Sequence, residues 1–185
     1  TLNGYERPVI IGELDDFTVD RIFDICPGTR IEGLPENELS PSTKIDKIWG
    51  PSRRIVRAWA GNPKTRFEGS TGGVLTALAQ FLLNDKRVDF ILHVKASVKE
   101  PTFGESHLSY TEADVLETGG SRYGPSSPLV NIDQILARGQ TFAFIGKPCD
   151  IAALRNLALY DERVNDLVKY WLTPVCGGFM APYSM

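Results

Sequence analysis

The chain has 185 residues, of which 42% are hydrophobic, and a net charge of -3 from 20 Lys and Arg against 23 Asp and Glu. This is enough for an ordinary buried core and favours one domain with an appendage. No basic block indicates a nucleic-acid surface, no apolar run approaches the ~20 residues that span a bilayer, and the first residues lack the order of a secretory signal. We therefore expect a cytoplasmic protein without a nucleic-acid partner or a membrane span.

The first 65 residues are rich in proline, which is spaced too closely for long helices or central strands. We interpret residues 1–65 as an extended arm or linker. Short elements are expected at residues 9–12 and 45–49, and the alternation of residues 52–59 predicts a strand. The prolines of this stretch are Pro8, Pro27, Pro35, Pro41, Pro51 and Pro63.

Residues 66–185 alternate regularly between helical and strand patterns. Apolar runs predict strands at residues 88–94, 106–110, 141–145 and 167–175. Apolar stripes and capping residues predict helices at 74–82, after Thr111, at 129–137 and at 151–159, the last one capped by Asp150. This order predicts an α/β domain with a mainly parallel or mixed sheet flanked by helices.

A cysteine stands where a predicted buried strand gives way to a helix. Cys149 follows the strand at residues 141–145 and the breakers Gly146 to Pro148. Open α/β sheets hold ligands at the carboxyl ends of their strands. A thiolate there would gain from the helix start and from the Lys147 ammonium, although a buried structural cysteine is the simpler alternative.

Two glycine-rich stretches are candidate ligand loops. The turn formed by Ser70, Thr71, Gly72 and Gly73 precedes the first predicted helix, so Ser70 or Thr71 is expected to cap that helix while free amides approach an anion. An ordinary capped helix is the alternative, because the turn matches neither the P-loop nor the dinucleotide fingerprint. In the second stretch Ser121, Arg122 and Tyr123 combine a phosphate-pairing guanidinium with an aromatic ring, but such clusters are also simple turns.

A second cysteine repeats the arrangement at Cys149. Cys176 follows the strand at residues 167–175 and precedes two glycines, so both sulfurs are expected on one side of the sheet. Two thiolates are half of the four that an iron-sulfur cluster usually takes. The third cysteine, Cys26, is far away in sequence, and the odd number argues against a disulfide scaffold. We expect His93 and His107 to be structural or exposed, since no catalytic or metal motif contains them.

The motifs together resemble the coenzyme F420 hydrogenase/dehydrogenase beta-subunit family, which includes chlorophyllide-type reductases. The resemblance covers about residues 66–180. It rests on four segments in this order: Ser70-Thr-Gly-Gly-Val-Leu-Thr-Ala-Leu78, Gly120-Ser-Arg-Tyr-Gly-Pro125, Gly146-Lys-Pro-Cys-Asp-Ile-Ala-Ala-Leu-Arg155 and Val175-Cys-Gly-Gly178.

The resemblance implies an iron-sulfur flavoprotein oxidoreductase with FAD, a 4Fe-4S cluster, and a deazaflavin, another electron carrier or a redox partner subunit. It assigns FAD contacts to the Ser70 to Gly73 turn and the Ser121 to Tyr123 loop. Lys147 would lie beside the flavin, where a cation stabilises a reduced, anionic ring, and Cys149 and Cys176 would be cluster ligands.

The chain also departs from the family pattern. The later cysteine pair that completes the ligand set is missing, and Asp16, Val19 and Ile22 stand where a ferredoxin spacing would place cysteines before Cys26. We therefore expect residues 66–185 to be a flavin- and cluster-binding domain truncated at its C-terminal end. Two alternatives stay open: a redox-inactive binding or scaffold domain, and an enzyme with Cys149 as nucleophile.

Overall fold

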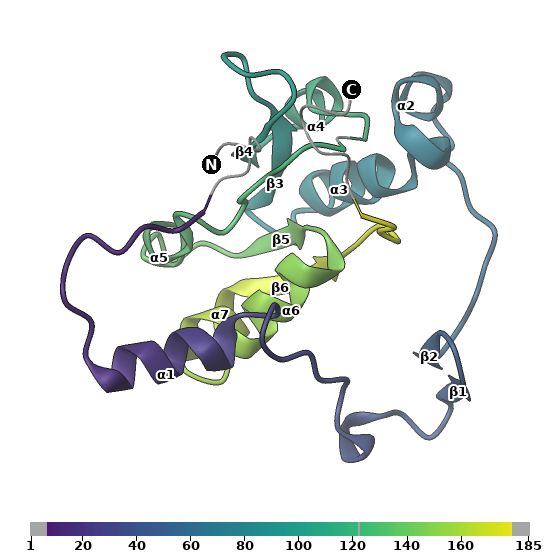
Figure 1. The fold of residues 1–185 in the computed structure, drawn as a ribbon. Coiled ribbons are helices and arrows are strands. Elements are labelled where there is room, and N and C mark those ends of the chain that lie inside the picture. Colours follow the sequence, from purple (N-terminus) through teal and green to yellow (C-terminus); the bar gives the residue numbers. More distant parts are fainter. Residues whose placement is uncertain (1–6, 122, 179–185) are drawn as a thin grey trace.

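The computed structural model describes residues 7–121 and 123–178. Its centre is a four-stranded sheet in the order β4-β3-β5-β6 (Figure 1). β3 pairs antiparallel with β4, whereas β5 is parallel to both β3 and β6. The strands are β3 (Phe90–Ala96), β4 (Gly104–Ser109), β5 (Phe142–Ile145) and β6 (Val168–Leu172). The prediction of a mixed sheet flanked by helices is confirmed.

Helices cover both faces of the sheet because its strands alternate between two hydrophobic clusters. On one face, Phe90 and Phe142 stack with ring centroids 5.1 Å apart. That face packs against α5 (Ile132–Leu136), α6 (Pro148–Leu157) and α7 (Glu162–Leu167). The opposite face, with Ile91 and Ala143, packs against α3 (Val74–Asn84) and α4 (Glu112–Glu117). Side chains of successive strand residues point to opposite faces, which explains the division.

One rim of the sheet contains the carboxyl ends of the parallel strands, where α/β sheets usually bind ligands. Ile145 of β5 lies opposite Leu172 of β6, and the Gly146 amide donates to the Leu172 carbonyl at 3.2 Å. In the neighbouring strand pair, the end of β3 at Ala96 lies opposite the start of β4 at Gly104. The carboxyl ends of the three parallel strands and the start of β4 therefore lie on the same rim.

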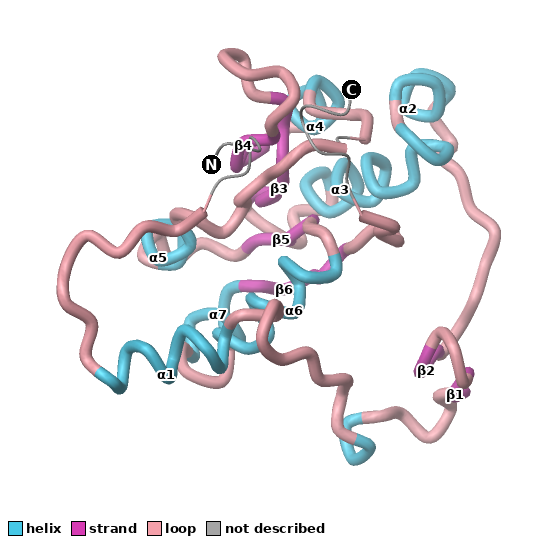
Figure 2. The backbone as a smooth tube through the Cα atoms, in the orientation of Figure 1, coloured by secondary structure: helices cyan, strands magenta, loops and turns pink. Residues whose placement is uncertain are grey.

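The N-terminal arm contains more structure than its prolines predict. It forms α1 (Asp16–Ile25), a 3-10 turn η1 (Glu36–Glu38), the hairpin of β1 (Lys44–Asp46) and β2 (Gly50–Ser52), and the start of α2 (Pro63–Glu68). Figure 2 shows loops joining these short elements along most of the arm. The ten-residue α1 fits between Pro8 and Pro27, with the Asp15 carboxylate accepting the Thr18 amide at 2.7 Å.

Two predicted elements of the arm are wrong, and a third is found as part of a hairpin. Residues 9–12 form no helix or strand, and residues 53–60 do not form the strand expected at 52–59. The element expected at 45–49 is instead the first strand and turn of the β1-β2 hairpin, in which Asp46 accepts the amides of Ile48 and Trp49 at 2.8 and 2.9 Å. The division at residue 65 stays a prediction, and α2 crosses it.

The predicted elements after residue 66 are confirmed, most of them with boundaries shifted by a few residues. α6 begins at Pro148 rather than Ile151, and its N-cap is Lys147 rather than Asp150. α5 is shorter than predicted, β6 ends at Leu172, and α7 was not predicted. No helix in the described ranges is long and apolar enough to cross a membrane.

Candidate functional site

The predicted glycine turn has an unusual backbone. Ser70–Gly73 forms a 3-10 turn, η2, in which Thr71, Gly72 and Gly73 have φ angles of 53°, 74° and 70°. Left-handed backbone is routine for glycine but costs energy at a residue such as Thr71, so the surroundings must hold it there. The N-cap of α3 is Gly73, without a side-chain cap bond. The expectation that Ser70 or Thr71 caps this helix is therefore wrong.

The turn is seated on α2 and on the preceding arm. A side chain at Gly73 would collide with the carbonyl oxygen of Thr65, and the Gly72 carbonyl accepts the Ala60 amide at 2.8 Å. Beneath it, the buried hydroxyl of Thr65 donates to Gln80 at 3.1 Å, and Gln80 in turn donates to the Glu112 carbonyl at 3.2 Å. Close packing and satisfied polar groups hold the turn in one conformation.

The two predicted ligand loops touch each other. The Ser121 amide donates to the Ser70 hydroxyl oxygen at 2.7 Å, across 51 residues of sequence. Tyr123 follows with a side chain that is 65% exposed. Arg122, the third predicted contact of this loop, lies outside the described residues. The structure therefore brings together the turn and the loop, which the sequence predicts only as separate motifs.

Lys147 ties the same loop region to α6. Its Nζ donates to the Ser126 hydroxyl at 2.8 Å and lies 2.8 Å from the Asp150 carboxylate. Asp150 also accepts the Lys147 backbone amide at 2.9 Å, which caps the first turn of the helix from position N3. Ser126 forms a bridge with Gly104 of β4, so this contact spans the rim of the sheet.

Both predicted cluster cysteines follow neighbouring parallel strands. Cys149 is the second residue of α6, directly after β5, and Cys176 lies four residues beyond the end of β6. Both side chains are exposed, and Cys176 accepts the Gly178 amide at 3.4 Å. The expectation that both follow strand ends at one rim agrees with the topology. Among the described residues, no three His, Cys, Asp or Glu side chains lie close enough to hold a metal ion.

The surroundings of Cys149 do not lower the pKa of its thiol, contrary to the expectation from the sequence. Partial burial and the adjacent Asp150 carboxylate raise the pKa of the Cys149 thiol, and Lys147 only partly opposes them. Asp150 competes for the Lys147 charge, which explains why the ammonium fails to lower the pKa overall. A thiol with a raised pKa is a poor nucleophile at neutral pH, and this argues against the alternative of a cysteine-nucleophile enzyme.

Sequence reasoning missed three polar residues around the rim. Ser126 carries no local signal, because its role depends on Gly104 and Lys147, which are distant in sequence. Asp150 was expected to cap α6, but not to pair with Lys147. Gln80 is buried against Thr65, away from the apolar positions that predicted α3, so no local pattern indicated its hydrogen bond.

His93 was correctly expected to be structural. It is 8% exposed and lies 2.8 Å from the Ser109 hydroxyl, opposite His107 in the β3-β4 ladder. Burial and the neighbouring His107 lower the pKa of His93 to about 4.

The fold and the rim define an open α/β domain with loops gathered at the carboxyl ends of its parallel strands. Family models for the coenzyme F420 hydrogenase/dehydrogenase beta subunit match residues 55–132 with the N-terminal part and residues 139–185 with the C-terminal part. The chain belongs to this family, and the resemblance predicted from its motifs is confirmed. The match also begins within the arm, earlier than the motifs indicate.

Relatives of known activity agree with this assignment. The chain is 31% identical over 116 residues to an F420-dependent formate dehydrogenase subunit beta of Methanocaldococcus jannaschii, covering 61% of this chain and 29% of that protein. It is 32% identical over 135 residues to an F420-dependent formate dehydrogenase 1 subunit beta of Methanococcus maripaludis, covering 71% and 33%. The chain thus spans about a third of the length of these curated relatives.

A solved structure shares the fold. It is a chain of the F420-reducing NiFe hydrogenase complex from Methanosarcina barkeri, with a TM-score of 0.61 and 20% identity. The match covers 68% of this chain and 45% of that one. At this identity the likeness establishes the architecture.

Proposed function

We propose that the chain is part of an oxidoreductase beta subunit that passes electrons between FAD, a 4Fe-4S cluster and a deazaflavin (coenzyme F420) or another redox partner. Family membership supports the class of reaction. The observation that carries the proposal is the link between the two predicted flavin loops, in which the Ser121 amide donates to Ser70. Lys147 adds a cation close to the same loop through Ser126.

The chemistry of these groups fits FAD. Hydroxyls, backbone amides and an ammonium are the donors that suit phosphate oxygens and the carbonyl oxygens of a flavin ring. The left-handed turn at Thr71, Gly72 and Gly73 lets its backbone approach a ligand closely. Bound FAD would supply exchange of two electrons with a substrate and one electron with a cluster. The residues of the rim bind and orient it, and Tyr123 is available to stack on an exposed ring.

The residues fit a 4Fe-4S cluster only in part. Cys149 and Cys176 would supply two of the four thiolates, and the described residues contain no third ligand close to them. Among the described residues, these two sulfurs would therefore supply half of a ligand set. This shortfall favours a second candidate function, a redox-inactive binding or scaffold domain that keeps the fold.

The visible spectrum of the longest natural form of the protein, purified without oxygen, separates the two candidates. An oxidoreductase should show flavin absorption and contain iron. A protein with neither flavin nor iron after anaerobic reconstitution would exclude the oxidoreductase and leave the scaffold.

The cluster ligands are tested in the same form by Cys149→Ser and Cys176→Ser. Each variant should lose its iron and retain FAD, because the flavin contacts lie on other residues. Cys26→Ser is the matched control. Cys26 is the C-cap of α1 and follows Ile25, which accepts a hydrogen bond from Asn156. Asn156 lies about 10 Å along α6 from Cys149, so the loss of the Cys26 thiol should leave the iron content unchanged. Normal iron in both rim variants would remove these cysteines from the ligand set.

A further inference from the structure

Lys147 is held in place by more contacts than the start of a helix needs. Its ammonium lies between the Asp150 carboxylate and the Ser126 hydroxyl, at 2.8 Å from each, and 3.5 Å from the Ser126 carbonyl. The same Asp150 oxygen accepts the Lys147 backbone amide. The lysine therefore folds back over its own helix start and does not extend into solvent.

The Lys147–Asp150 pair is the least exposed ion pair in the described part of the chain. The two side chains are 28% and 14% exposed, whereas the next pair, Arg163 with Asp161, is 44% and 20% exposed. Coulomb interactions strengthen as water is excluded, so Asp150 offsets more of the lysine's charge than an exposed carboxylate would. The net positive charge at the rim thus depends on Asp150 as well as on Lys147.

Helix capping alone does not explain this arrangement. At α4, Asp114 at N3 likewise accepts the amides of Tyr110 and Thr111 at 3.1 and 3.0 Å, and no lysine takes part. An ammonium has no acceptor for a backbone amide, so the Lys147 side chain adds nothing to the cap that Asp150 provides at α6. Its second partner, Ser126, follows the predicted flavin loop of Ser121 to Tyr123.

Ser126 is itself fixed to the sheet. It bridges Gly104 of β4, and the Gly104 amide donates to the Pro125 carbonyl at 2.8 Å. Two residues earlier, a side chain at Gly124 would collide with the Thr102 carbonyl, so the backbone passes too close for any other residue. The position of the Lys147 ammonium is thus set by α6 on one side and by the β4 edge on the other.

We infer that Asp150 and Ser126 are positioning residues for Lys147, and that Asp150 sets how much positive charge the rim presents to a bound flavin. The inference rests on the proposed FAD site. Ser126 orients the ammonium through its hydroxyl, while Asp150 both orients it and balances its charge. A flavin bound at this rim is harder to reduce than it would be beside an unbalanced lysine, since a nearby cation favours the negative charge gained on reduction.

The decisive variant is Asp150→Asn in the longest natural form of the protein loaded with FAD. Asparagine keeps an oxygen for the Lys147 amide but removes the negative charge. The flavin midpoint potential, measured by spectroelectrochemistry, should become more positive. In Lys147→Met/Asp150→Asn the potential should lie below that of Asp150→Asn, because the ammonium that favours the reduced ring is gone.

Two further variants separate positioning from folding. Ser126→Ala removes one hydrogen bond to the ammonium and should weaken FAD binding about five-fold in a fluorescence titration, with little change in potential. Asp114→Asn is the matched control, since it weakens the equivalent cap on α4 and should change neither quantity. Asp150→Glu, which restores the charge, should bring the potential back toward that of the wild type.

The outcomes distinguish this inference from the proposed function. A wild-type protein that binds no FAD overturns the proposed function. A protein that binds FAD, but in which Asp150→Asn moves the potential no more than Asp114→Asn does, retains the proposed function and overturns the role of Asp150. If Asp150→Asn does not fold, Asp150→Ser, which also removes the charge, takes its place. A potential in Asp150→Ser equal to that of the wild type, together with unchanged FAD affinity in Ser126→Ala, would overturn the positioning role.

Discussion

The sheet with its helices and the N-terminal arm are stabilised very differently. The core residues of β3 and β5 are fully buried between two layers of helices. In the arm between α1 and α2, by contrast, large apolar side chains such as Ile48, Trp49 and Ile55 are 84%, 79% and 87% exposed. Burial of apolar area is the main stabilising term in folding, so the sheet domain contributes most of the stability and the arm contributes little.

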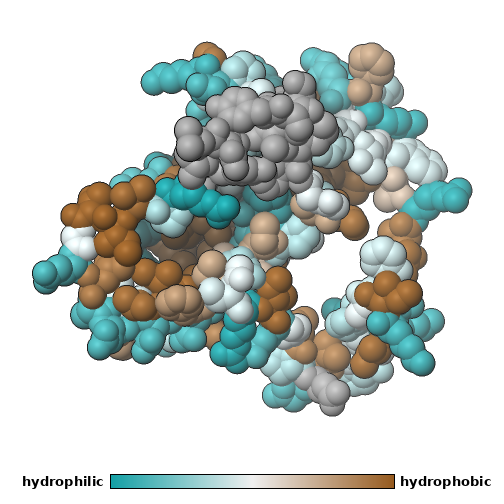
Figure 3. Space-filling model, viewed as in Figure 1, coloured by the Kyte–Doolittle hydropathy of each residue, from teal (hydrophilic) through white to brown (hydrophobic). Residues whose placement is uncertain are grey.

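The start of the arm is nevertheless attached to the sheet domain through α1. α1 packs along α6, where Asn156 donates to the Ile25 carbonyl at 3.2 Å, and Tyr160 in the turn after α6 donates to Asp24 at 2.6 Å. The Arg21 guanidinium lies 3.9 Å from the centre of the Tyr160 ring. Figure 3 shows hydrophobic side chains gathered over the N-terminal segment and α1, and open space between the β1-β2 region and the rest of the molecule.

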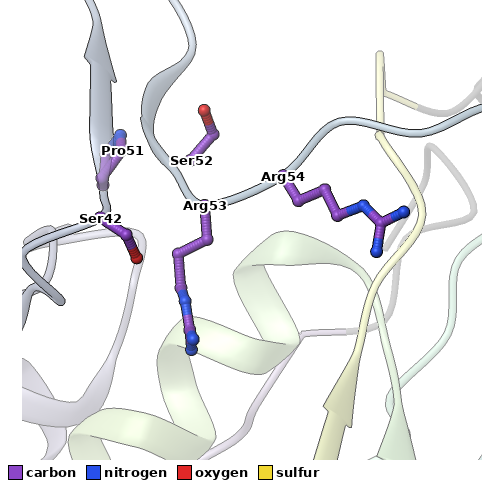
Figure 4. Close-up of a pocket in the computed structure, with 5 residues that line it drawn as sticks. All are labelled: Ser42, Pro51, Ser52, Arg53 and Arg54. Carbon is purple, nitrogen blue, oxygen red and sulfur yellow. The ribbon is translucent and has the colours of Figure 1, made fainter.

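Beyond α1 the arm carries exposed positive charge. A shallow depression at the end of the hairpin is lined by Ser42, Pro51, Ser52, Arg53 and Arg54, and the two arginine side chains extend in different directions (Figure 4). Neither arginine forms an ion pair with another described residue. This depression lies apart from the rim, which carries the candidate site.

The largest expected effect separates the core from the arm directly. Phe144→Ala removes a fully buried ring from the cluster under α6 and should lower the free energy of unfolding by about 3–5 kcal/mol. Trp49→Ala removes a larger but exposed side chain and should change it by less than about 0.5 kcal/mol. Urea unfolding of both variants measures the difference, and equal losses would contradict the division into core and arm.

Acid should weaken the sheet domain through His93. Its pKa is about 4 in the folded state and about 6.5 when unfolded. The unfolded chain therefore takes up a proton first, and stability is lost as the pH falls from about 6.5 toward 4, by roughly 3 kcal/mol at most.

The acid effect is measured by unfolding at several pH values and comparing the wild type with His93→Gln. Glutamine keeps a polar partner for Ser109 but does not titrate, so the variant should lose less stability over this pH range. Parallel pH profiles of the two proteins would show that His93 is protonated equally in both states.

The η2 turn lies where the sheet domain meets the arm, and two glycine variants test whether the turn packs on α2. Gly73 and Gly139 both have left-handed backbone, with φ angles of 70° and 65°, but only at Gly73 would a side chain meet the Thr65 carbonyl. Alanine at either position should lower the free energy of unfolding by about 1–2 kcal/mol, because alanine disfavours left-handed backbone. At Gly73 the collision with the Thr65 carbonyl should lower it by roughly 2 kcal/mol more. Differential scanning calorimetry compares them, and equal melting temperatures would mean that the turn is not seated on α2.

The same contrast explains what the sequence could predict. The apolar run of β5 is a pattern that burial imposes, and it predicted the strand. The apolar stripe of α3 predicted the helix, although Leu78 and Phe81 of that stripe are 41% and 50% exposed. In the arm no burial imposes a pattern, and the alternation at residues 52–59 has no neighbouring strand to pair with. The helix α1 was missed because proline density outweighed the Asp15 cap, and Pro148 at N1 was a neglected sign that α6 begins early.

The candidate site was predictable in its parts but not in its assembly. Glycine turns and strand-end cysteines are local patterns. The structure brings the Ser70 turn against the Ser121 loop, and both cysteines follow the ends of neighbouring parallel strands. The bonds that join them, from Ser121 to Ser70 and from Lys147 to Ser126, depend on which strands become neighbours. Pairwise contacts between distant segments leave no trace in a single sequence.

The smallest expected effect concerns the attachment of the arm. Tyr160→Phe removes the bond to Asp24 and should weaken the packing of α1 on α6 by about 0.5–1 kcal/mol. Detachment of α1 should then become two- to five-fold more frequent, and limited proteolysis should cut within α1 faster by that factor. Tyr110→Phe is the matched control. It loses a hydrogen bond of 2.9 Å that Arg138 donates, this bond does not involve the arm, and the variant should be cut at the wild-type rate. If both variants are cut alike, α6 does not hold the arm through Tyr160, and its attachment depends on the Asn156 bond and the apolar contacts of α1.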